Sequence, residues 1–202
     1  MTKSKTITSK VLERFGATGT HWSILEDDGE YQLCTLVSEL FPLRHDLSIV
    51  EIGTHQGVSA SVLAKFGIVN TYDVVDWPLR DEIIEHLGNS HRIEFKLIPT
   101  ENGGKQLPGE PDRMNIIREG NEWLSAELRN KTFDIAFIDG NHEHESVVQN
   151  FESVKHCGVV VFHDYNKNQF HNHRTVRFVD SIPKNYGGNI RTNEPFAVWQ
   201  YV

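Results

Sequence analysis

The chain has 202 residues and a formal net charge of −8, with 38% hydrophobic and 24% charged residues. This composition is typical of a globular protein, and we expect one domain over residues 1–202. The negative charge argues against nucleic acid and against an anionic membrane surface as partners, because both attract a basic face. A small molecule is the expected partner.

Nothing in the sequence predicts export or insertion into a membrane. No apolar run approaches the ~20 residues that a spanning helix needs. The first ten residues, M-T-K-S-K-T-I-T-S-K, contain no apolar stretch of the kind found in signal peptides. Cys34 and Cys157 form no motif and suit a reducing compartment. The sequence therefore predicts a cytoplasmic protein.

The first predicted elements lead to a glycine-containing turn. Residues 1–45 are expected to form an amino-terminal arm that becomes helical over Gly29–Phe41. A nearly continuous apolar run, Leu47–Ile52, predicts a strand covered on both faces. The turn and a helix that stops at Gly67 come next, and Thr71–Asp76 is the second predicted strand.

Strands and helices are predicted to alternate along the rest of the chain. Residues 88–113 are expected to contain an insertion loop, since Pro99–Arg113 is rich in glycine and proline. The other expected elements are helix Asp81–Leu87, strand Arg92–Ile98, strand Met114–Arg118, helix Asn121–Leu128, strand Phe133–Ile138, helix Glu145–Lys155, strand Val159–Phe162, helix Thr175–Ile182 and a terminal hairpin ending in Phe196–Val202. This alternation predicts an α/β fold with a doubly wound, mostly parallel sheet and an antiparallel C-terminal strand, in which ligands bind beyond the carboxyl ends of the strands.

The turn after the first strand is the strongest local pattern, I-V-E-I-G-T-H-Q-G-V-S-A. Gly53 and Gly57 bracket it, and a helix follows at once, so backbone N–H groups could face a polar or anionic ligand. The dinucleotide fingerprint is not satisfied, because His55 and Val58 stand where glycines are required. Alternatively, the glycines only allow a tight connection between strand and helix.

Acidic and amide side chains follow the other predicted strands. Asp76 lies about twenty residues beyond the glycine turn and could accept the hydroxyl groups of a ribose; the alternative is a surface acid. Asp73 competes for this role, but it is expected to fall inside the strand. Asn121 or Glu122 could meet an adenine edge.

Two later segments, F-D-I-A-F-I-D-G-N-H-E-H-E and C-G-V-V-V-F-H-D-Y-N, each end a predicted strand in acids and histidines. With the turn motif E-x-G-x-x-x-G-x-S, they resemble class I S-adenosylmethionine (SAM) dependent methyltransferases. The subgroup is the one that contains catechol- and macrocin-type O-methyltransferases and cephalosporin-hydroxylase-type proteins. The resemblance covers about Ile49 to Asn166, with Cys157-Gly158 in place of the usual Gly-Gly. It implies a SAM site formed by Glu51, Gly53, Thr54, His55, Gly57, Ser59, Asp76, Asn121 and Asp139.

Methylation of a hydroxyl group requires removal of its proton, which a divalent cation would assist. In catechol-type relatives an acid after strand four and two oxygen ligands after strand five hold the metal. Asp139 and Asp164 match two of these, so Mg²⁺ or Mn²⁺ is expected. His163 takes the third position, where nitrogen ligation would favour Mn²⁺, Fe²⁺ or Zn²⁺. Alternatively, no metal binds and Asp139 contacts the amino group of the cofactor.

His142 is the predicted general base, and Asp139 is counted with it as catalytic; His142 could instead cap a helix or bind metal. The expected function is SAM-dependent O-methylation of a small hydroxylated acceptor, such as a sugar or natural product. A metal-dependent hydroxylase on the same fold and a noncatalytic SAM-binding module are the alternatives. A homo-oligomer is also open, because the apolar end F-A-V-W-Q-Y-V could lie inside the sheet or form a dimer interface.

Overall fold

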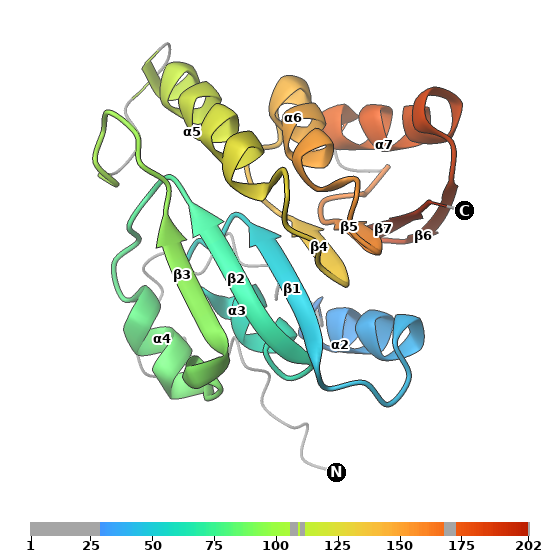
Figure 1. Cartoon of the computed structure of the whole chain (residues 1–202), viewed down its shortest axis with the longest axis horizontal. Helices are drawn as coiled ribbons and strands as arrows, with labels where there is room; N and C mark the ends of the chain where they lie inside the picture. The colour runs from blue at the N-terminus through green and yellow to red at the C-terminus, as the bar shows by residue number, and fades with distance from the viewer. Residues whose placement is uncertain (1–28, 106–108, 110–111, 168–172, 202) are drawn as a thin grey trace.

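The computed structural model describes residues 29–105, 109, 112–167 and 173–201. Among these, seven strands form one sheet in the order β3-β2-β1-β4-β5-β7-β6 (Figure 1). Strands β1 to β5 pair in parallel, whereas β7 and β6 continue the sheet in antiparallel. The predicted doubly wound sheet with an antiparallel C-terminal end is therefore confirmed.

The elements have the following bounds. The strands are β1 Leu47–Ile52, β2 Gly67–Asp73, β3 Ile93–Leu97, β4 Ile135–Ile138, β5 Val159–Phe162, β6 Asn189–Asn193 and β7 Phe196–Gln200. The helices are α2 Gly29–Leu40, α3 Val58–Leu63, α4 Arg80–Leu87, α5 Asp112–Leu128, α6 His144–Val154 and α7 His173–Tyr186, with a short 3-10 helix η3 at Ser90–Arg92.

Helices cover both faces of the sheet, with α2, α3 and α4 on one face and α5, α6 and α7 on the other (Figure 1). Successive strand residues point to opposite faces, so Ile49 packs with the first group of helices and Val50 with the second. Each fully buried side chain of this size stabilises the fold by about 1.5–3 kcal/mol. This explains why β1, β4 and β5 are almost continuously apolar.

The predicted strand Met114–Arg118 is wrong, because these residues belong to α5, which also includes the predicted helix Asn121–Leu128. Gly120 lies between the two predicted elements. Inside α5, a Cβ on Gly120 would lie 2.5 Å from Cγ1 of Val74, so the glycine allows the helix to pack closely on the sheet. The third strand along the chain is β3, which corresponds to the predicted strand Arg92–Ile98.

The second predicted strand, Thr71–Asp76, is displaced by three to four residues, since β2 runs from Gly67 to Asp73. Gly67 was expected to end the preceding helix, but α3 already ends at Leu63. A Cβ on Gly67 would lie 1.9 Å from the carbonyl oxygen of Leu47, its partner in β1. The glycine is therefore required by the close pairing of the two strands.

The predicted arm over residues 1–45 is described only from α2 onward, and its first 28 residues lie outside the described part of the chain. Residues 88–113 contain η3, the edge strand β3, a turn near residues 101–104 and the start of α5, with residues 106–108 and 110–111 outside the description. Within the described residues, no helix is both long enough and apolar enough to cross a membrane.

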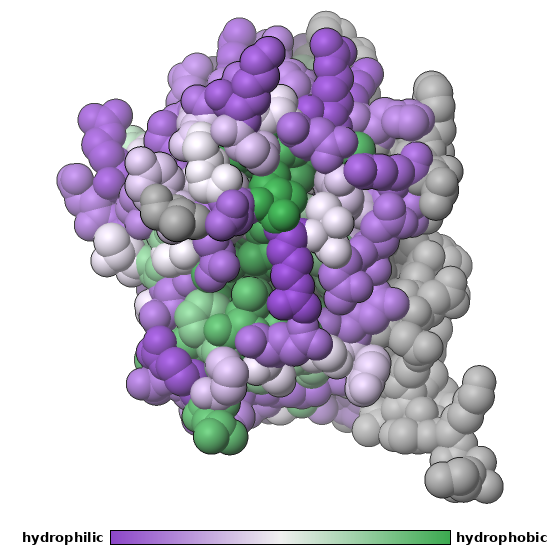
Figure 2. Space-filling view, turned by 90° about the vertical axis from the view of Figure 1, so that its right-hand side faces the viewer, coloured by the Kyte–Doolittle hydropathy of each residue, from purple (hydrophilic) through white to green (hydrophobic). Residues whose placement is uncertain are grey.

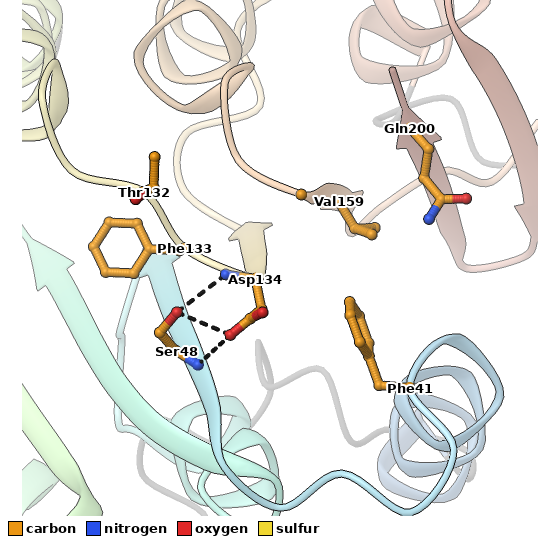
Figure 3. A pocket seen from close by; sticks show the side chains of 8 residues that line it. Phe41, Ser48, Thr132, Phe133, Asp134, Val159 and Gln200 are labelled. Atoms are coloured by element: carbon orange, nitrogen blue, oxygen red, sulfur yellow. Dashed lines mark hydrogen bonds between the residues drawn. The ribbon is translucent and has the colours of Figure 1, made fainter. Parts of the chain in front are cut away.

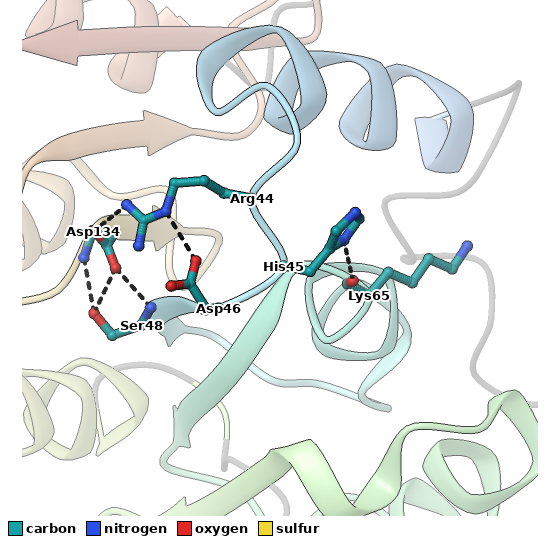
Figure 4. Close-up of polar contacts among 6 residues, drawn as sticks. All are labelled: Arg44, His45, Asp46, Ser48, Lys65 and Asp134. Atoms are coloured by element: carbon teal, nitrogen blue, oxygen red, sulfur yellow. Dashed lines mark hydrogen bonds and ion pairs between the residues drawn. The ribbon is translucent and has the colours of Figure 1, made fainter.

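At the amino edge of the sheet, the first residues of β1 and the residue before β4 are joined by polar contacts (Figure 4). The backbone N–H and hydroxyl of Ser48 donate to Oδ2 of Asp134 at 2.8 and 3.0 Å. Arg44 donates to the other carboxylate oxygen at 3.1 Å and also binds Asp46. These contacts fix the start of β1 against the start of β4.

The apolar carboxyl-terminal segment lies inside the sheet, because β7 pairs with β5 on one side and β6 on the other. Polar and charged side chains dominate the corresponding side of the molecule, with a narrower hydrophobic area between them (Figure 2). An ion pair between Arg191 of β6 and Glu39 of α2 connects the end of the sheet to the first helix.

Candidate functional site

Four adjacent strands bring acids and histidines to the carboxyl edge of the sheet. Since β2, β1, β4 and β5 are neighbours and parallel, the residues that follow them meet at one edge. Ile138 of β4 is paired with Phe162 of β5, so Asp139 and His163 emerge side by side. The expected clustering of these strand ends is therefore found in the structure.

Asp139 and His163 form a hydrogen-bonded pair, with 2.7 Å between Oδ1 of the acid and Nδ1 of the imidazole. Burial alone would lower the pKa of His163, but the neighbouring carboxylates of Asp139 and Asp164 outweigh it and raise the pKa to about 10. Without a bound cation, His163 is therefore an imidazolium held between two acids.

His142 and Asp164 form a second pair, with 2.7 Å between Nε2 of the imidazole and Oδ2 of the acid. Burial works to lower the pKa of His142, yet the hydrogen bond and charge of Asp164 raise it overall. Burial likewise acts to raise the pKa of Asp164, but the two histidines bring it well below its usual range. The side chain of His142 remains 42% exposed and accessible to a ligand.

Asp164 has a left-handed backbone conformation, with φ of 57°, which is uncommon outside glycine. Its Oδ1 lies 3.5 Å from Nδ1 of His163, so this one carboxylate faces both histidines. His144, two residues beyond His142, begins α6, is exposed and contacts Phe178 edge-on. His142 is thus paired with an acid of the cluster, whereas His144 packs against an aromatic ring.

Donor atoms of Asp139, His163 and Asp164 all lie within 4.8 Å of one another. These are the three residues predicted to bind metal. Two carboxylates and an imidazole could hold a divalent cation such as Mn²⁺ or Fe²⁺. The hydrogen bond between Asp139 and His163 is compatible with such a site, because a cation would replace the proton that they share.

The glycine turn lies directly beside Asp139. Gly53 has φ of 98°, and a Cβ there would lie 2.3 Å from the carbonyl oxygen of Asp139. At Gly57, with φ of 77°, a Cβ would meet Cδ1 of Ile84 at 2.5 Å. Both glycines are therefore required by packing within the protein. The following helix α3 has only six residues, all buried, so the expected helix-end site for an anion gains little support.

Beneath the turn lies a buried chain of hydrogen bonds that includes two predicted residues, Glu51 and Thr54. The hydroxyl of Thr71 donates to Oε2 of Glu51 at 2.5 Å, and Thr54 lies 2.5 Å from the same hydroxyl. Since Thr71 has one proton to donate, Thr54 donates to Thr71. Ser59, in the first turn of α3, is also buried and helps to stabilise ionised Glu51.

Thr71 was not predicted as a site residue. It is the partner of Glu51 in the β1–β2 ladder, and this pairing follows only once β2 is known to begin at Gly67. A buried threonine opposite a buried acid is the feature that marks this position, and it appears only with the register.

Asp73, rather than Asp76, ends β2. Its carboxylate accepts the N–H groups of His55, Val75 and the Trp77 indole at 2.8, 3.0 and 3.2 Å. Burial raises its pKa, although these donors oppose the shift. Asp76 lies three residues beyond the strand, is 60% exposed and pairs with Arg80 at 2.7 Å.

His55 and Asn121 lie in different surroundings. His55 has φ of 46° and packs edge-on against Trp77, with 4.5 Å between ring centroids; burial lowers its pKa. Asn121 was predicted to follow a strand, but no strand precedes it, because residues 112–128 form α5. It is buried within α5 and donates to Gln149 of α6 at 3.0 Å, so it links two helices.

A cavity lies at the opposite, amino edge of the sheet (Figure 3). It is lined by Phe41, Ser48, Thr132, Phe133, Asp134, Gly158, Val159 and Gln200. None of the predicted site residues lines it, and its acid, Asp134, already accepts hydrogen bonds from Ser48 and Arg44. The chemistry of the strand ends is therefore separate from this cavity.

Comparison with known proteins identifies the family of this chain. Residues 50–165, from β1 to just beyond Asp164, match the family model of a methyltransferase domain. The chain belongs to this methyltransferase family. No curated protein matches the sequence.

Solved structures of other methyltransferases share the fold. A SAM-dependent O-methyltransferase from Thermotoga maritima has a TM-score of 0.58 at 12% identity, over 98% of this chain and 72% of its own. An RNA methyltransferase, described as putative, from Pyrococcus horikoshii gives 0.54 at 14% identity, over 87% and 83%. A methyltransferase from Geobacter sulfurreducens gives 0.53 at 11% identity, over 100% and 91%. At these identities the likeness is one of fold, and family and fold together support SAM as the cofactor of this methyltransferase.

Proposed function

We propose that this methyltransferase transfers a methyl group from SAM to a hydroxyl oxygen of a small acceptor, with help from a divalent cation. The observation that carries the proposal is the group formed by Asp139, His163, Asp164 and His142 at the carboxyl edge. These side chains lie next to the glycine turn and support the proposal, because three of them could hold a cation and His142 could act as a base. A hydroxyl group is a weak acid, so its methylation gains from both a base and a cation.

The residues beside the turn fit a cofactor with cationic groups. Glu51, Asp73 and Asp139 place three carboxyl groups around Gly53 and Thr54, and one oxygen of buried Glu51 has no hydrogen-bond partner in the described part of the chain. Acids in such positions attract the ammonium and sulfonium groups of SAM. When bound, SAM supplies a methyl group activated by its positive sulfur.

Which acid receives the ribose is open between two residues. Asp76 was predicted and is the more exposed, so its carboxylate is accessible although Arg80 occupies one oxygen. Asp73 ends β2 and lies beside His55 and Trp77, whose rings could border a nucleoside. Because strand ends position ligands in this fold, we favour Asp73 and retain Asp76 as the alternative.

His142 is the group that would accept the proton of the acceptor hydroxyl. Asp164 binds Nε2, which leaves Nδ1 to face the acceptor and stabilises the imidazolium that forms. His142 would hold the hydroxyl proton, while the methyl group would exchange its bond to sulfur for one to the acceptor oxygen and leave neutral S-adenosylhomocysteine. A cation on Asp139, His163 and Asp164 would supply Lewis acidity that makes the hydroxyl easier to deprotonate.

The test is calorimetric titration of metal-stripped protein with SAM, alone and with Mg²⁺ or Mn²⁺, followed by a screen of hydroxylated acceptors. We expect saturable SAM binding and methylation that requires Mn²⁺ or Mg²⁺. Absence of SAM binding under every condition would reject the function. Full activity in metal-free protein would reject the role of the cation alone.

A second candidate, a metal-dependent hydroxylase, is favoured by one observation. One imidazole and two carboxylates, close together and partly exposed, also suit Fe²⁺ in oxygen-using enzymes. The two reactions differ in their requirements, because hydroxylation consumes oxygen and methylation does not. A reaction that proceeds without oxygen and transfers label from methyl-labelled SAM excludes the hydroxylase.

A further inference from the structure

Within the part of the chain that the structure describes, the carboxyl group of Glu51 is buried with no cationic side chain acting on it. Its side chain is 0% exposed. Thr71 donates to Oε2, whereas Oε1 has no hydrogen-bond partner among the described residues. A carboxylate in such a place is costly unless it is paired, because burial removes its hydration. The group is therefore built either to remain neutral or to receive a positive ligand.

Among the described residues, those around Glu51 offer no positive charge. The charged groups that act on it most strongly are Asp73 from the end of β2 and Asp139 from the end of β4, and both are acids. From α3 comes the hydroxyl of Ser59, and the imidazole of His55 is kept neutral by burial. Burial is the largest cause that raises the pKa of Glu51 to about 8, so its carboxyl is protonated at neutral pH.

We propose that Glu51 releases its proton to solvent when SAM binds, and that the resulting carboxylate selects this cationic cofactor over its product S-adenosylhomocysteine. This inference rests on the proposed function. SAM carries a positive sulfonium, which the product lacks after the methyl group has left. A ligand with the extra charge gains more from ionised Glu51, so binding of SAM is coupled to loss of the proton. S-adenosylhomocysteine is attracted less strongly to ionised Glu51, so it should dissociate more readily.

The experiment is calorimetric titration of metal-stripped protein with SAM at pH 7, in two buffers with different ionisation enthalpies. The difference in measured enthalpy gives the number of protons released. We expect about one proton per SAM, a smaller release with S-adenosylhomocysteine, and roughly tenfold weaker binding of that product. At pH 9 the release with SAM should largely disappear, because Glu51 is already ionised.

Glu51→Gln keeps the shape of the side chain and an acceptor for Thr71, but it cannot ionise. This variant should bind SAM with little proton release, and its affinities for SAM and the product should approach each other. Glu82→Gln, at an exposed position on α4, is the matched control and should behave like the wild-type protein.

Two results would overturn the inference. The first is wild-type protein that binds SAM with the same enthalpy in both buffers, and the second is Glu51→Gln that releases as many protons as wild type. Either would leave the proposed function standing. Failure of wild-type protein to bind SAM at all would instead overturn the proposed function together with this inference. The wild-type measurement needs no variant, so it decides the question even if Glu51→Gln does not fold.

Discussion

Oδ1 of Asp139 lies 2.7 Å from Nδ1 of His163, although 24 positions separate the two residues in the sequence. Adjacent parallel strands produce this contact, because each residue directly follows the end of its strand. The pair shares its surroundings with Asp164, which faces both His163 and His142. Substitution of His163 should therefore affect binding of a cation, whereas substitution of His142 should affect proton transfer.

His142→Gln should lower the rate constant of methyl transfer by roughly 10²- to 10⁴-fold, since it removes the proposed base. SAM affinity, measured by calorimetry, should change little. The measurement is single-turnover methylation with the acceptor identified by the screen. His144→Gln is the control two residues away, on the exposed first turn of α6. Equal rates for wild type and His142→Gln would remove His142 from the mechanism.

His163→Asp should change the preference among metals. The wild-type set of one imidazole and two carboxylates favours Mn²⁺ over Mg²⁺, and an all-oxygen set reduces this advantage. We expect the ratio of the two affinities to fall on the order of tenfold. Direct titration of metal-stripped protein measures both affinities without reference to activity. A ratio that does not change would show that His163 is not a ligand.

Glu51 should make stability depend on pH. Its pKa is about 8 in the folded protein, against 4.5 for an ordinary glutamate. The unfolded chain therefore loses this proton first, so the contribution is fully present below pH 4.5 and is lost as pH rises toward 8. We expect the free energy of unfolding to decrease over this range by a few kcal/mol more in wild type than in Glu51→Gln. Urea unfolding at several pH values tests this, and parallel curves for the two proteins would contradict it.

Gly53→Ala should be strongly destabilising, because the new Cβ would meet the backbone of Asp139 and φ of 98° is unfavourable for alanine. Backbone strain and overpacking together predict a loss of about 2–5 kcal/mol. Gly88→Ala is the matched control. It has φ of 82° and ψ of 171°, and a Cβ added there would meet no atom within 4 Å, so this variant should show the loss from backbone strain alone, about 1–3 kcal/mol. Urea unfolding of both variants compares them, and similar losses would show that strain, not the contact with Asp139, governs Gly53.

Prediction from the sequence was most accurate for strands that are mostly apolar and buried on both faces. The bounds of β1 and β5 were predicted without error, because a run buried on both faces has sharp polar ends. It failed where a glycine has a role in packing. Gly67 allows β2 to approach β1 but was interpreted as the end of a helix, and Gly120, which allows α5 to approach Val74, falls between the two elements predicted in place of α5.

Within the candidate site, the sequence indicated the residues that follow β4 and β5, but it did not indicate which of them form hydrogen bonds with one another. The closeness of Asp139, His163 and Asp164 follows from strand order alone. The contact between Asp164 and His142 also requires the left-handed backbone of Asp164, which no sequence pattern indicates. Thr71 was missed because its pairing with Glu51 depends on the register between β1 and β2.

The polar contacts between Ser48 and Asp134 have a consequence for how this protein can change. They hold β1 and β4 together at their starts, roughly 17 Å of extended chain from Gly53 and Asp139 at their ends. Sliding one strand past the other by a single residue would break these contacts and the close approach of Gly53 to Asp139 together. The distance between Gly53 and Asp139 is thus fixed by the contacts between Ser48 and Asp134 at the opposite edge of the sheet. Loops around the carboxyl edge can diverge to accept new substrates while that spacing stays constant.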